Sequence, residues 1–231
     1  MKVVLVALNA KYSHSSLALR YLKHYCEPQF PDLETMECNI NQDPSAILAD
    51  LASRNPDVVG FSCYIWNIEL ILPLVGDLRK VCPQTVIILG GPEVSFDVEY
   101  WLKRYQAVDF LIAGEGEEAL RRFLEAFSHS EGAPAQKDLA TICGLVYRQG
   151  ENVVANPQEP LDLATIPPLY AGDIGELQNK IVYYETTRGC PYACAYCLSS
   201  VMGRVRKFPE ARWMQELQSL AKAGVEQVRF V

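Results

Sequence analysis

The stretch Val86-Ile-Ile-Leu-Gly-Gly-Pro-Glu-Val-Ser95 joins an apolar, β-branched run to a glycine turn, and it decides the fold. Runs of the same kind alternate with helical patterns through the first half of the chain: Val3 to Leu8, Thr35 to Asn39, Val58 to Ser62 and Phe110 to Ala113. Apolar strands that alternate with helices are typical of a parallel sheet covered on both faces. The sequence therefore predicts an α/β domain over residues 1–128.

Two of the intervening helices carry local signals. Asp43 is a suitable N-cap with Pro44 at the first helical position, and the Asn-Pro pair at 55–56 ends the same helix. The segment from Ile68 to Lys80 is also expected to be helical. Because Pro73 lies inside it, we expect that helix to start late or to kink.

Residues 129–175 are predicted to be a linker, because the composition after Phe127 changes to small and polar residues. Two short β patterns within it, Leu145 to Arg148 and Asn152 to Ala155, flank Gln-Gly-Glu and predict a small hairpin. The connector from Asn156 to Gly172 contains four prolines. These disfavour helix and sheet and predict a tether between two bodies.

Residues 176–231 show a second α/β pattern. A β run from Ile181 to Thr187 is followed by a helical pattern from Pro209 to Ala223, and then by an apolar run from Val225 to Val231. The last run is typical of a buried strand. This amounts to one and a half βα units, and we expect the segment to be the truncated start of a second domain.

The overall composition favours a soluble, cytoplasmic protein. The chain is 49% hydrophobic, yet it contains neither an apolar run long enough to cross a membrane nor a signal peptide pattern. Its formal net charge of −7 disfavours general binding to nucleic acid. Five scattered cysteines are expected to be buried free thiols in a reducing compartment: Cys26, Cys38, Cys63, Cys82 and Cys143.

The remaining cysteines, Cys190, Cys194 and Cys197, have the spacing C-x3-C-x2-C. A structural zinc site needs four ligands, and neither a fourth cysteine nor a histidine lies near this loop. Three thiolates can instead hold an iron-sulfur cubane and leave one iron open to an exogenous ligand. Two alternatives are a zinc site completed by the distant Cys143 and a redox pair formed by Cys194 and Cys197.

This loop resembles the cluster motif of the radical S-adenosylmethionine (SAM) enzymes, which also have an aromatic residue before the last cysteine, here Tyr196. The resemblance implies a [4Fe-4S] cluster on the three cysteines, with the open iron binding the amino and carboxylate groups of SAM. It implies that Tyr196 lies near the adenine. It further implies that an electron from the cluster cleaves SAM and gives a 5′-deoxyadenosyl radical, with a flavodoxin or ferredoxin as electron donor.

Small, amide and acidic residues follow four of the predicted strands. They lie in Asn9 to Ser15, Ser62 to Asn67, Gly90 to Ser95 and Gly114 to Glu118. In an open parallel sheet, ligands bind beyond the carboxyl ends of the strands, where the strand order reverses. Glycines at these ends permit close approach of a bulky ligand, although each turn taken singly is also an ordinary tight connection.

Together with the cysteine loop, these segments resemble the cobalamin-binding domain that precedes the radical domain in cobalamin-dependent radical SAM enzymes. The resemblance covers essentially the whole chain. It implies a flavodoxin-like, doubly wound sheet of five parallel strands in the order 2-1-3-4-5, followed by the linker hairpin and the start of a radical SAM (β/α) barrel. The residues it assigns to cobalamin are Asn9, Ser62, Cys63, Tyr64, Asn67, Gly90, Gly91, Pro92, Glu93, Gly114, Glu115, Gly116 and Glu117.

One departure concerns the cobalt atom of cobalamin. Many cobalamin proteins have D-x-H-x-x-G after the first strand, and its histidine ligates cobalt, but Asn9 and Lys11 occupy the Asp and His places here. The nearby His14 is interpreted as a loop histidine. We therefore expect a lower cobalt face without a histidine ligand.

The leading hypothesis is a cobalamin-dependent radical SAM enzyme, or its N-terminal fragment, for methyl transfer or a radical rearrangement. Residues 176–231 alone would leave the cluster exposed to water, so turnover by this chain alone is not expected. The alternative is a cobalamin and iron-sulfur binding module without catalysis, or one half of a split enzyme. A plain nucleotide-binding or receiver domain is disfavoured, because no G-x-G-x-x-G and no acidic cluster follow the first strand.

Overall fold

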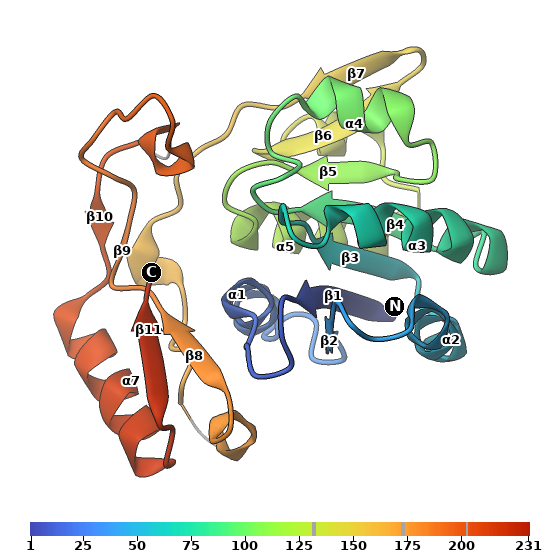
Figure 1. The fold of residues 1–231 in the computed structure, drawn as a ribbon. Helices are drawn as coiled ribbons and strands as arrows, with labels where there is room; N and C mark the ends of the chain where they lie inside the picture. The colour runs from blue at the N-terminus through green and yellow to red at the C-terminus, as the bar shows by residue number, and fades with distance from the viewer. Residues whose placement is uncertain (131–132, 172–173, 202) are drawn as a thin grey trace. The chain divides into compact units, whose positions relative to one another are not determined.

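The computed structural model describes residues 1–130, 133–171, 174–201 and 203–231. The chain divides into two compact units, and most of their helices and strands are labelled in Figure 1. The first unit consists of Met1–Tyr12 and Ala18–Pro160, and the second of Ser13–Leu17 and Leu161–Val231. None of the helices in the described ranges is long and apolar enough to cross a membrane.

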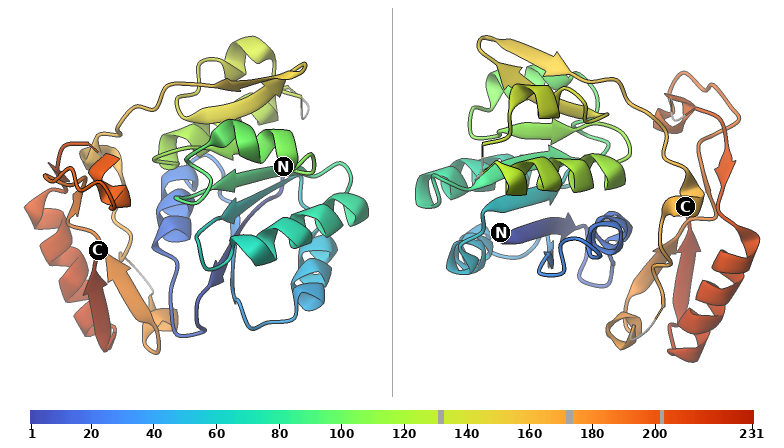
Figure 2. Two further views of the ribbon diagram at one scale, coloured as in Figure 1. Left: turned by 45° about the horizontal axis from the view of Figure 1, so that its top comes forward. Right: turned by 180° about the vertical axis from the view of Figure 1, so that it is seen from behind.

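The first unit contains a seven-stranded sheet in the order β2-β1-β3-β4-β5-β6-β7. Its first five strands are all parallel, and the predicted order 2-1-3-4-5 is confirmed. Figure 2 shows the sheet from two further sides. The strands are β1 (Val3–Asn9), β2 (Glu34–Asn39), β3 (Val58–Ser62), β4 (Val86–Gly90), β5 (Phe110–Ile112), β6 (Leu145–Gln149) and β7 (Asn152–Ala155).

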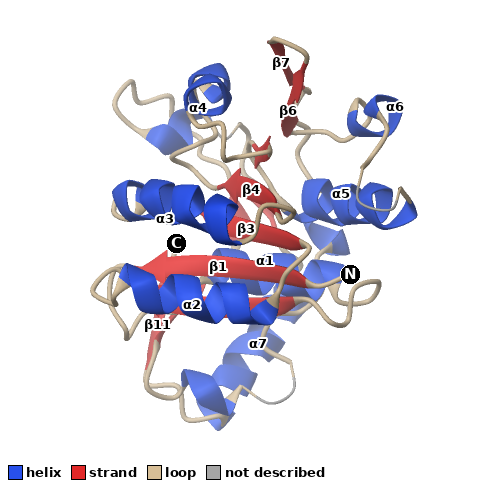
Figure 3. Cartoon of the chain, turned by 90° about the vertical axis from the view of Figure 1, so that its right-hand side faces the viewer, coloured by secondary structure: helices blue, strands red, loops and turns tan. Residues whose placement is uncertain are grey.

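Helices cover both faces of this sheet, as Figure 3 illustrates. Alternate side chains of β1 face opposite ways, so Val4 and Val6 pack with α2, α3 and α4, whereas Val3 and Leu5 pack with α1, α5 and α6. The result is one apolar core on each side. The helices are α1 (Leu17–Cys26), α2 (Pro44–Arg54), α3 (Ile68–Val81), α4 (Val98–Arg104), α5 (Glu117–His129) and α6 (Gln136–Leu139).

The predicted hairpin is present, but it is part of the sheet rather than of a separate linker. Leu145 pairs with Ile112 of β5 in antiparallel register, and β7 continues the sheet outward. The sheet is therefore mixed and larger than the five parallel strands expected. The physical reason is burial: Leu145 and Val146 are almost completely buried, and they cover the edge of β5, which would otherwise present unpaired backbone groups.

The local helix signals are largely confirmed. The Asp43 carboxylate accepts a hydrogen bond from the Ser45 backbone N–H, and Asn55 ends α2 in the left-handed conformation. The sequence predicts that α3 starts late or kinks at Pro73, and the helix does not start late, since it begins at Ile68 with Pro73 inside it. The carbonyl left without its usual donor belongs to Glu69, which is exposed, so water can replace the missing bond.

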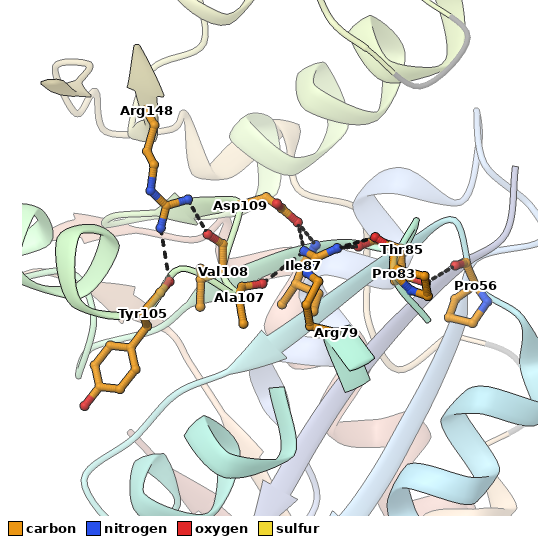
Figure 4. A network of polar contacts seen from close by, with 10 residues as sticks. All are labelled: Pro56, Arg79, Pro83, Thr85, Ile87, Tyr105, Ala107, Val108, Asp109 and Arg148. Carbon is orange, nitrogen blue, oxygen red and sulfur yellow. Dashed lines mark hydrogen bonds and ion pairs between the residues drawn. The ribbon is translucent and has the colours of Figure 1, made fainter. Parts of the chain in front are cut away.

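Two arginines organise the amino ends of β4 and β5 (Figure 4). Arg79 donates to the carbonyls of Pro83, Thr85 and Ala107 and to the carboxylate of Asp109. That carboxylate also accepts the N–H of Ile87. On the next strand, the Arg148 guanidinium donates to the carbonyls of residues 102, 105 and 108. These bonds lie at the edge where the parallel strands begin and where the antiparallel β6 ends.

The second unit is built on β8 (Ile181–Tyr184) and β11 (Gln227–Phe230), which pair in parallel. The helix α7 (Glu210–Lys222) precedes β11 in the chain. The segment Ser13–Leu17 joins this unit through a bridge between His14 and Ile181. A second pair of strands, β9 (Thr187–Arg188) and β10 (Arg206–Lys207), is antiparallel, and short 3-10 turns lie at Leu163–Thr165, Gly175–Leu177 and Leu198–Val201. The burial expected for the last strand is not met, because β11 is largely exposed.

A buried carboxylate ties the connector to this unit. Glu216 of α7 accepts hydrogen bonds from the backbone N–H groups of Leu169 and Tyr170, from the hydroxyl of Tyr184 and from the guanidinium of Arg212. Burial, with the hydrogen bond to Glu216, raises the pKa of Tyr184 above its ordinary value. The proline-rich connector is thus fixed at residues 169–170 by a fully satisfied charge.

Candidate functional site

The turn after β3 is the centre of the carboxyl edge of the first sheet. The Tyr64 backbone N–H donates to the side-chain oxygen of Asn67 at 2.7 Å, and the Asn67 N–H donates to the Tyr64 carbonyl. Cys63 is completely buried, and this burial raises the pKa of its thiol. Ser62, the last residue of β3, is also buried. Cys63 and Asn67 therefore shape the turn from inside.

The residues between them face outward. Ile65 is 79% exposed and Trp66 is 46% exposed. The Trp66 ring stacks on the Tyr64 ring, with centroids 4.3 Å apart and planes 9° apart. Exposed apolar side chains gathered on a tight turn are typical of a binding surface. Sequence reasoning missed Ile65 and Trp66, although two large apolar residues on a predicted turn were the available signal.

The turn after β4 packs directly on the turn after β3. Gly91 has φ +106°, and a Cβ built on it would lie 2.6 Å from the Cys63 carbonyl oxygen, so only glycine permits this approach. The Cys63 N–H donates to the Gly90 carbonyl at 2.7 Å, and the Glu93 N–H donates back to Cys63. Pro92 and Glu93 are half-buried. The two turns form one backbone-supported platform.

The turn after β5 continues this edge. The Ser95 hydroxyl donates to the Gly91 carbonyl and accepts the N–H of Gly114, which links the second turn to the third. Gly114 has φ +83°, again in the region that favours glycine. Glu115 is half-buried. Gly116 is the N-cap residue of α5, and the buried Glu117 lies in its first turn, where a carboxylate is favoured by the helix dipole.

The loop after β1 contributes less to the edge. The Asn9 side-chain amide donates to the Glu37 carboxylate at 2.7 Å, which turns it toward β2. His14 belongs to the second unit, where its Nδ1 and the Tyr183 hydroxyl form a hydrogen bond of 2.9 Å. The adjacent Ser15 hydroxyl donates to the Ile181 carbonyl. His14 is therefore a loop residue that is held in place by these hydrogen bonds to β8.

The cysteine loop lies in the second unit and is closed at its base. The pairing of β9 with β10 brings residues 188 and 206 together. Gly189 has φ +94°, and a Cβ there would collide with the carbonyl of Arg204. The N–H of Cys190 donates to the Gly203 carbonyl at 3.2 Å. The two ends of the loop are therefore fixed by backbone contacts.

The cysteines themselves are free and accessible. Cys190 and Cys194 are half-buried and Cys197 is exposed, while Tyr196 is 93% exposed. Within the described ranges, no group of three His, Cys, Asp or Glu side chains is arranged around a single metal ion. A cubane binds each thiolate through a different iron, so its ligands do not need to converge on one point. The assignment of the three cysteines to a cluster stays a prediction.

Comparison with known proteins agrees with this architecture. The family described as B12 binding domain matches residues 3–124. The chain is 28% identical to the cobalamin-dependent radical SAM methyltransferase TokK of Streptomyces tokunonensis, over 97% of this chain and 34% of that protein. It is 31% identical to 2-(S-pantetheinyl)-carbapenam-3-carboxylate methyltransferase of Streptantibioticus cattleyicolor, over 74% of this chain and 26% of that protein. The chain thus spans about a third or less of these relatives.

A solved structure shows the same fold. The cobalamin-dependent S-adenosylmethionine radical enzyme OxsB, with aqua-cobalamin and S-adenosylmethionine bound, superposes with a TM-score of 0.80 at 20% identity. The match covers 96% of this chain and 32% of that one. With the family match extending over more than half of its residues, the chain belongs to the B12 binding domain family, in the form found in the N-terminal part of cobalamin-dependent radical SAM proteins.

Proposed function

We propose that the chain is the cofactor-binding part of a cobalamin-dependent radical SAM methyltransferase. Cobalamin binds at the carboxyl edge of the first sheet, and a [4Fe-4S] cluster binds to the cysteine loop and to SAM. The observation that carries the proposal is the platform after β3 and β4, where Tyr64, Ile65 and Trp66 face outward over a backbone that only Gly91 allows to close.

The residues at this edge fit the chemistry of a corrin. A corrin ring has broad apolar faces and a rim of amide groups, so it needs both an apolar surface and hydrogen-bonding partners. Ile65 and Trp66 supply exposed apolar surface. The half-buried carboxylates of Glu93 and Glu115 can accept hydrogen bonds from amide N–H groups. Gly114 is exposed, and the place that a side chain would take on it is filled by the flexible Gln158 side chain.

The cysteine loop fits a cluster with one open iron. Three thiolates from Cys190, Cys194 and Cys197 satisfy three irons, and the fourth is left for the amino and carboxylate groups of SAM. Tyr196, whose ring is free of the protein core, can lie against an adenine. When bound, cobalamin supplies a transferable methyl group, and the cluster supplies an electron to SAM. A flavodoxin or ferredoxin then returns an electron to the cluster.

Anaerobic reconstitution with iron, sulfide and hydroxocobalamin tests both sites. After desalting, we expect about four irons per chain, as the cubane requires, and about one cobalt. A variant with Cys190, Cys194 and Cys197 changed to alanine should lose the iron and keep the cobalt. A control variant with Cys82→Ala and Cys143→Ala, two other half-buried free thiols, should keep both metals.

Each outcome separates the two sites. Iron that persists in the triple variant would refute the cluster assignment. Absence of cobalt in every variant would refute cobalamin binding at the carboxyl edge and leave the first unit with a different ligand.

A further inference from the structure

Asn67 occupies an unusual place for a buried amide. Its side chain is 1% exposed and lies at the crevice between β1 and β3, where the strand order of the sheet reverses. Its amide nitrogen donates to the Leu8 carbonyl of β1 at 3.1 Å and to the Ser62 carbonyl of β3 at 2.9 Å. Both of its N–H groups are therefore used to join the two strands.

These bonds continue the strand pairing beyond its last backbone step. The register of β1 and β3 ends with Ala7 opposite Ser62. At that point the Asn67 amide takes the place of a further backbone pair, and it fixes the separation of the strand ends. Ligands of doubly wound sheets bind at this crevice, so its width matters for binding.

The Asn67 side chain joins the two strands instead of capping the helix that follows it. Asn67 is the N-cap residue of α3, yet in the described part of the chain its side chain makes no capping bond to that helix. Its oxygen accepts the Tyr64 N–H instead, and this bond closes the turn that presents Ile65 and Trp66. A single amide thus sets both the crevice and the orientation of the exposed turn.

We infer that Asn67 is a positioning residue for cobalamin. It fixes the crevice and the exposed turn on which cobalamin binds, and it does not contact cobalamin itself. The inference rests on the proposed cobalamin site. It replaces the expectation that Asn67 contacts the corrin directly, because a buried side chain whose two polar atoms already make three hydrogen bonds has no surface to offer.

The test compares Asn67→Asp and Asn67→Ala with Thr85→Val. The aspartate has the same shape and keeps the acceptor for Tyr64, but it loses both donors and sets oxygen against two carbonyls. Thr85 is the matched control, since its buried hydroxyl donates to the Pro56 carbonyl at 2.7 Å at the opposite edge of the sheet. The probe is hydroxocobalamin, titrated by absorbance and by the visible circular dichroism of the bound corrin.

We expect both Asn67 variants to bind hydroxocobalamin about tenfold or more weakly than the wild type, with an altered visible circular dichroism spectrum. Thr85→Val should melt at a lower temperature, yet bind with wild-type affinity and spectrum. If Asn67→Asp does not fold, because it buries a negative charge against two carbonyls, Asn67→Ala decides. Asn67 variants that match Thr85→Val in both affinity and spectrum would overturn the inference while the cobalamin site stands. A wild type without affinity would remove the proposed site and the inference together.

Discussion

At the amino edge of the first sheet, Arg79 and Arg148 together donate to six backbone carbonyls and Asp109 closes the network, whereas at the carboxyl edge the turns after β3 and β4 meet through a glycine. A substitution at the amino edge is costly because it leaves a charged side chain without its hydrogen-bond partner. The carboxyl edge leaves large side chains such as Ile65 exposed. The same sheet therefore has one edge held by charged hydrogen bonds and one edge where large apolar side chains stay exposed, and we propose the second as the ligand surface.

The largest effect is expected at the amino edge. Asp109→Ala removes the acceptor of both Arg79 and the Ile87 N–H, and it should lower the free energy of unfolding by about 3 kcal/mol, as for hydrogen bonds to a charged group. Urea unfolding measures this loss. Cobalamin affinity of the folded fraction should not change.

The control for this variant is Asp77→Ala, which breaks the exposed pair with Lys80 and should cost less than about 1 kcal/mol. If the two variants lost equal stability, or if Asp109→Ala weakened cobalamin binding in the folded protein, the division between the edges would be wrong.

The second effect is expected where the carboxyl edge closes. Gly91→Ala combines a left-handed backbone with a collision against the Cys63 carbonyl, so it should cost about 2 kcal/mol or more and weaken cobalamin binding. Urea unfolding and hydroxocobalamin titration measure the two effects.

Gly150→Ala separates strain from collision. Gly150 also has φ +62°, but among the described residues no atom lies within 4 Å of its built Cβ. It should cost about 1 kcal/mol, from backbone strain alone, and leave cobalamin binding intact. Equal effects at the two glycines would mean that the close approach of the turns is unimportant.

The fold was the predictable part of this comparison. The five apolar runs, the Asp43 cap and the hairpin all follow from local pattern, because strand periodicity and turn chemistry are written in neighbouring residues. The attachment of the hairpin to β5 is a long-range choice. It depends on which strand edge Leu145 can bury, and no local signal carries that information.

Side-chain direction at the carboxyl edge was the unpredictable part. The sequence places residues 62–67 after a strand, but it does not tell that Cys63 and Asn67 turn inward while Ile65 and Trp66 turn outward. Direction there is set by bonds to other turns, as between Cys63 and Gly90. For the same reason, the transfer of Ser13–Leu17 to the second unit was not foreseen.

A smaller, pH-dependent effect is expected at α5, which begins at the carboxyl edge. Hydrogen bonds from Arg121, with a further one from Tyr25, hold the pKa of Glu118 below its ordinary value of 4.5. A carboxyl whose folded pKa is lowered stabilises above its unfolded pKa, and this contribution is lost as the pH falls through the folded value. Glu118→Gln should therefore cost under about 1 kcal/mol at pH 7, because the pair is partly exposed.

Urea unfolding of both proteins between pH 7 and pH 3 measures this difference. The gap between wild type and Glu118→Gln should shrink as the pH falls below the ordinary carboxyl value of 4.5, because the wild-type carboxylate then becomes protonated. A gap that stayed constant with pH would assign the loss to packing instead of charge.

The smallest effect on the cofactor is expected from His14→Ala. The His14 ring is bonded to Tyr183 within the second unit, so its removal should cost some stability there and leave the absorption spectrum of bound cobalamin unchanged. Tyr183→Phe removes the same hydrogen bond from the other side and should reproduce both results. A spectral shift in His14→Ala that Tyr183→Phe lacks would make the imidazole a cobalt ligand, since only that role depends on the ring itself and not on its hydrogen bond.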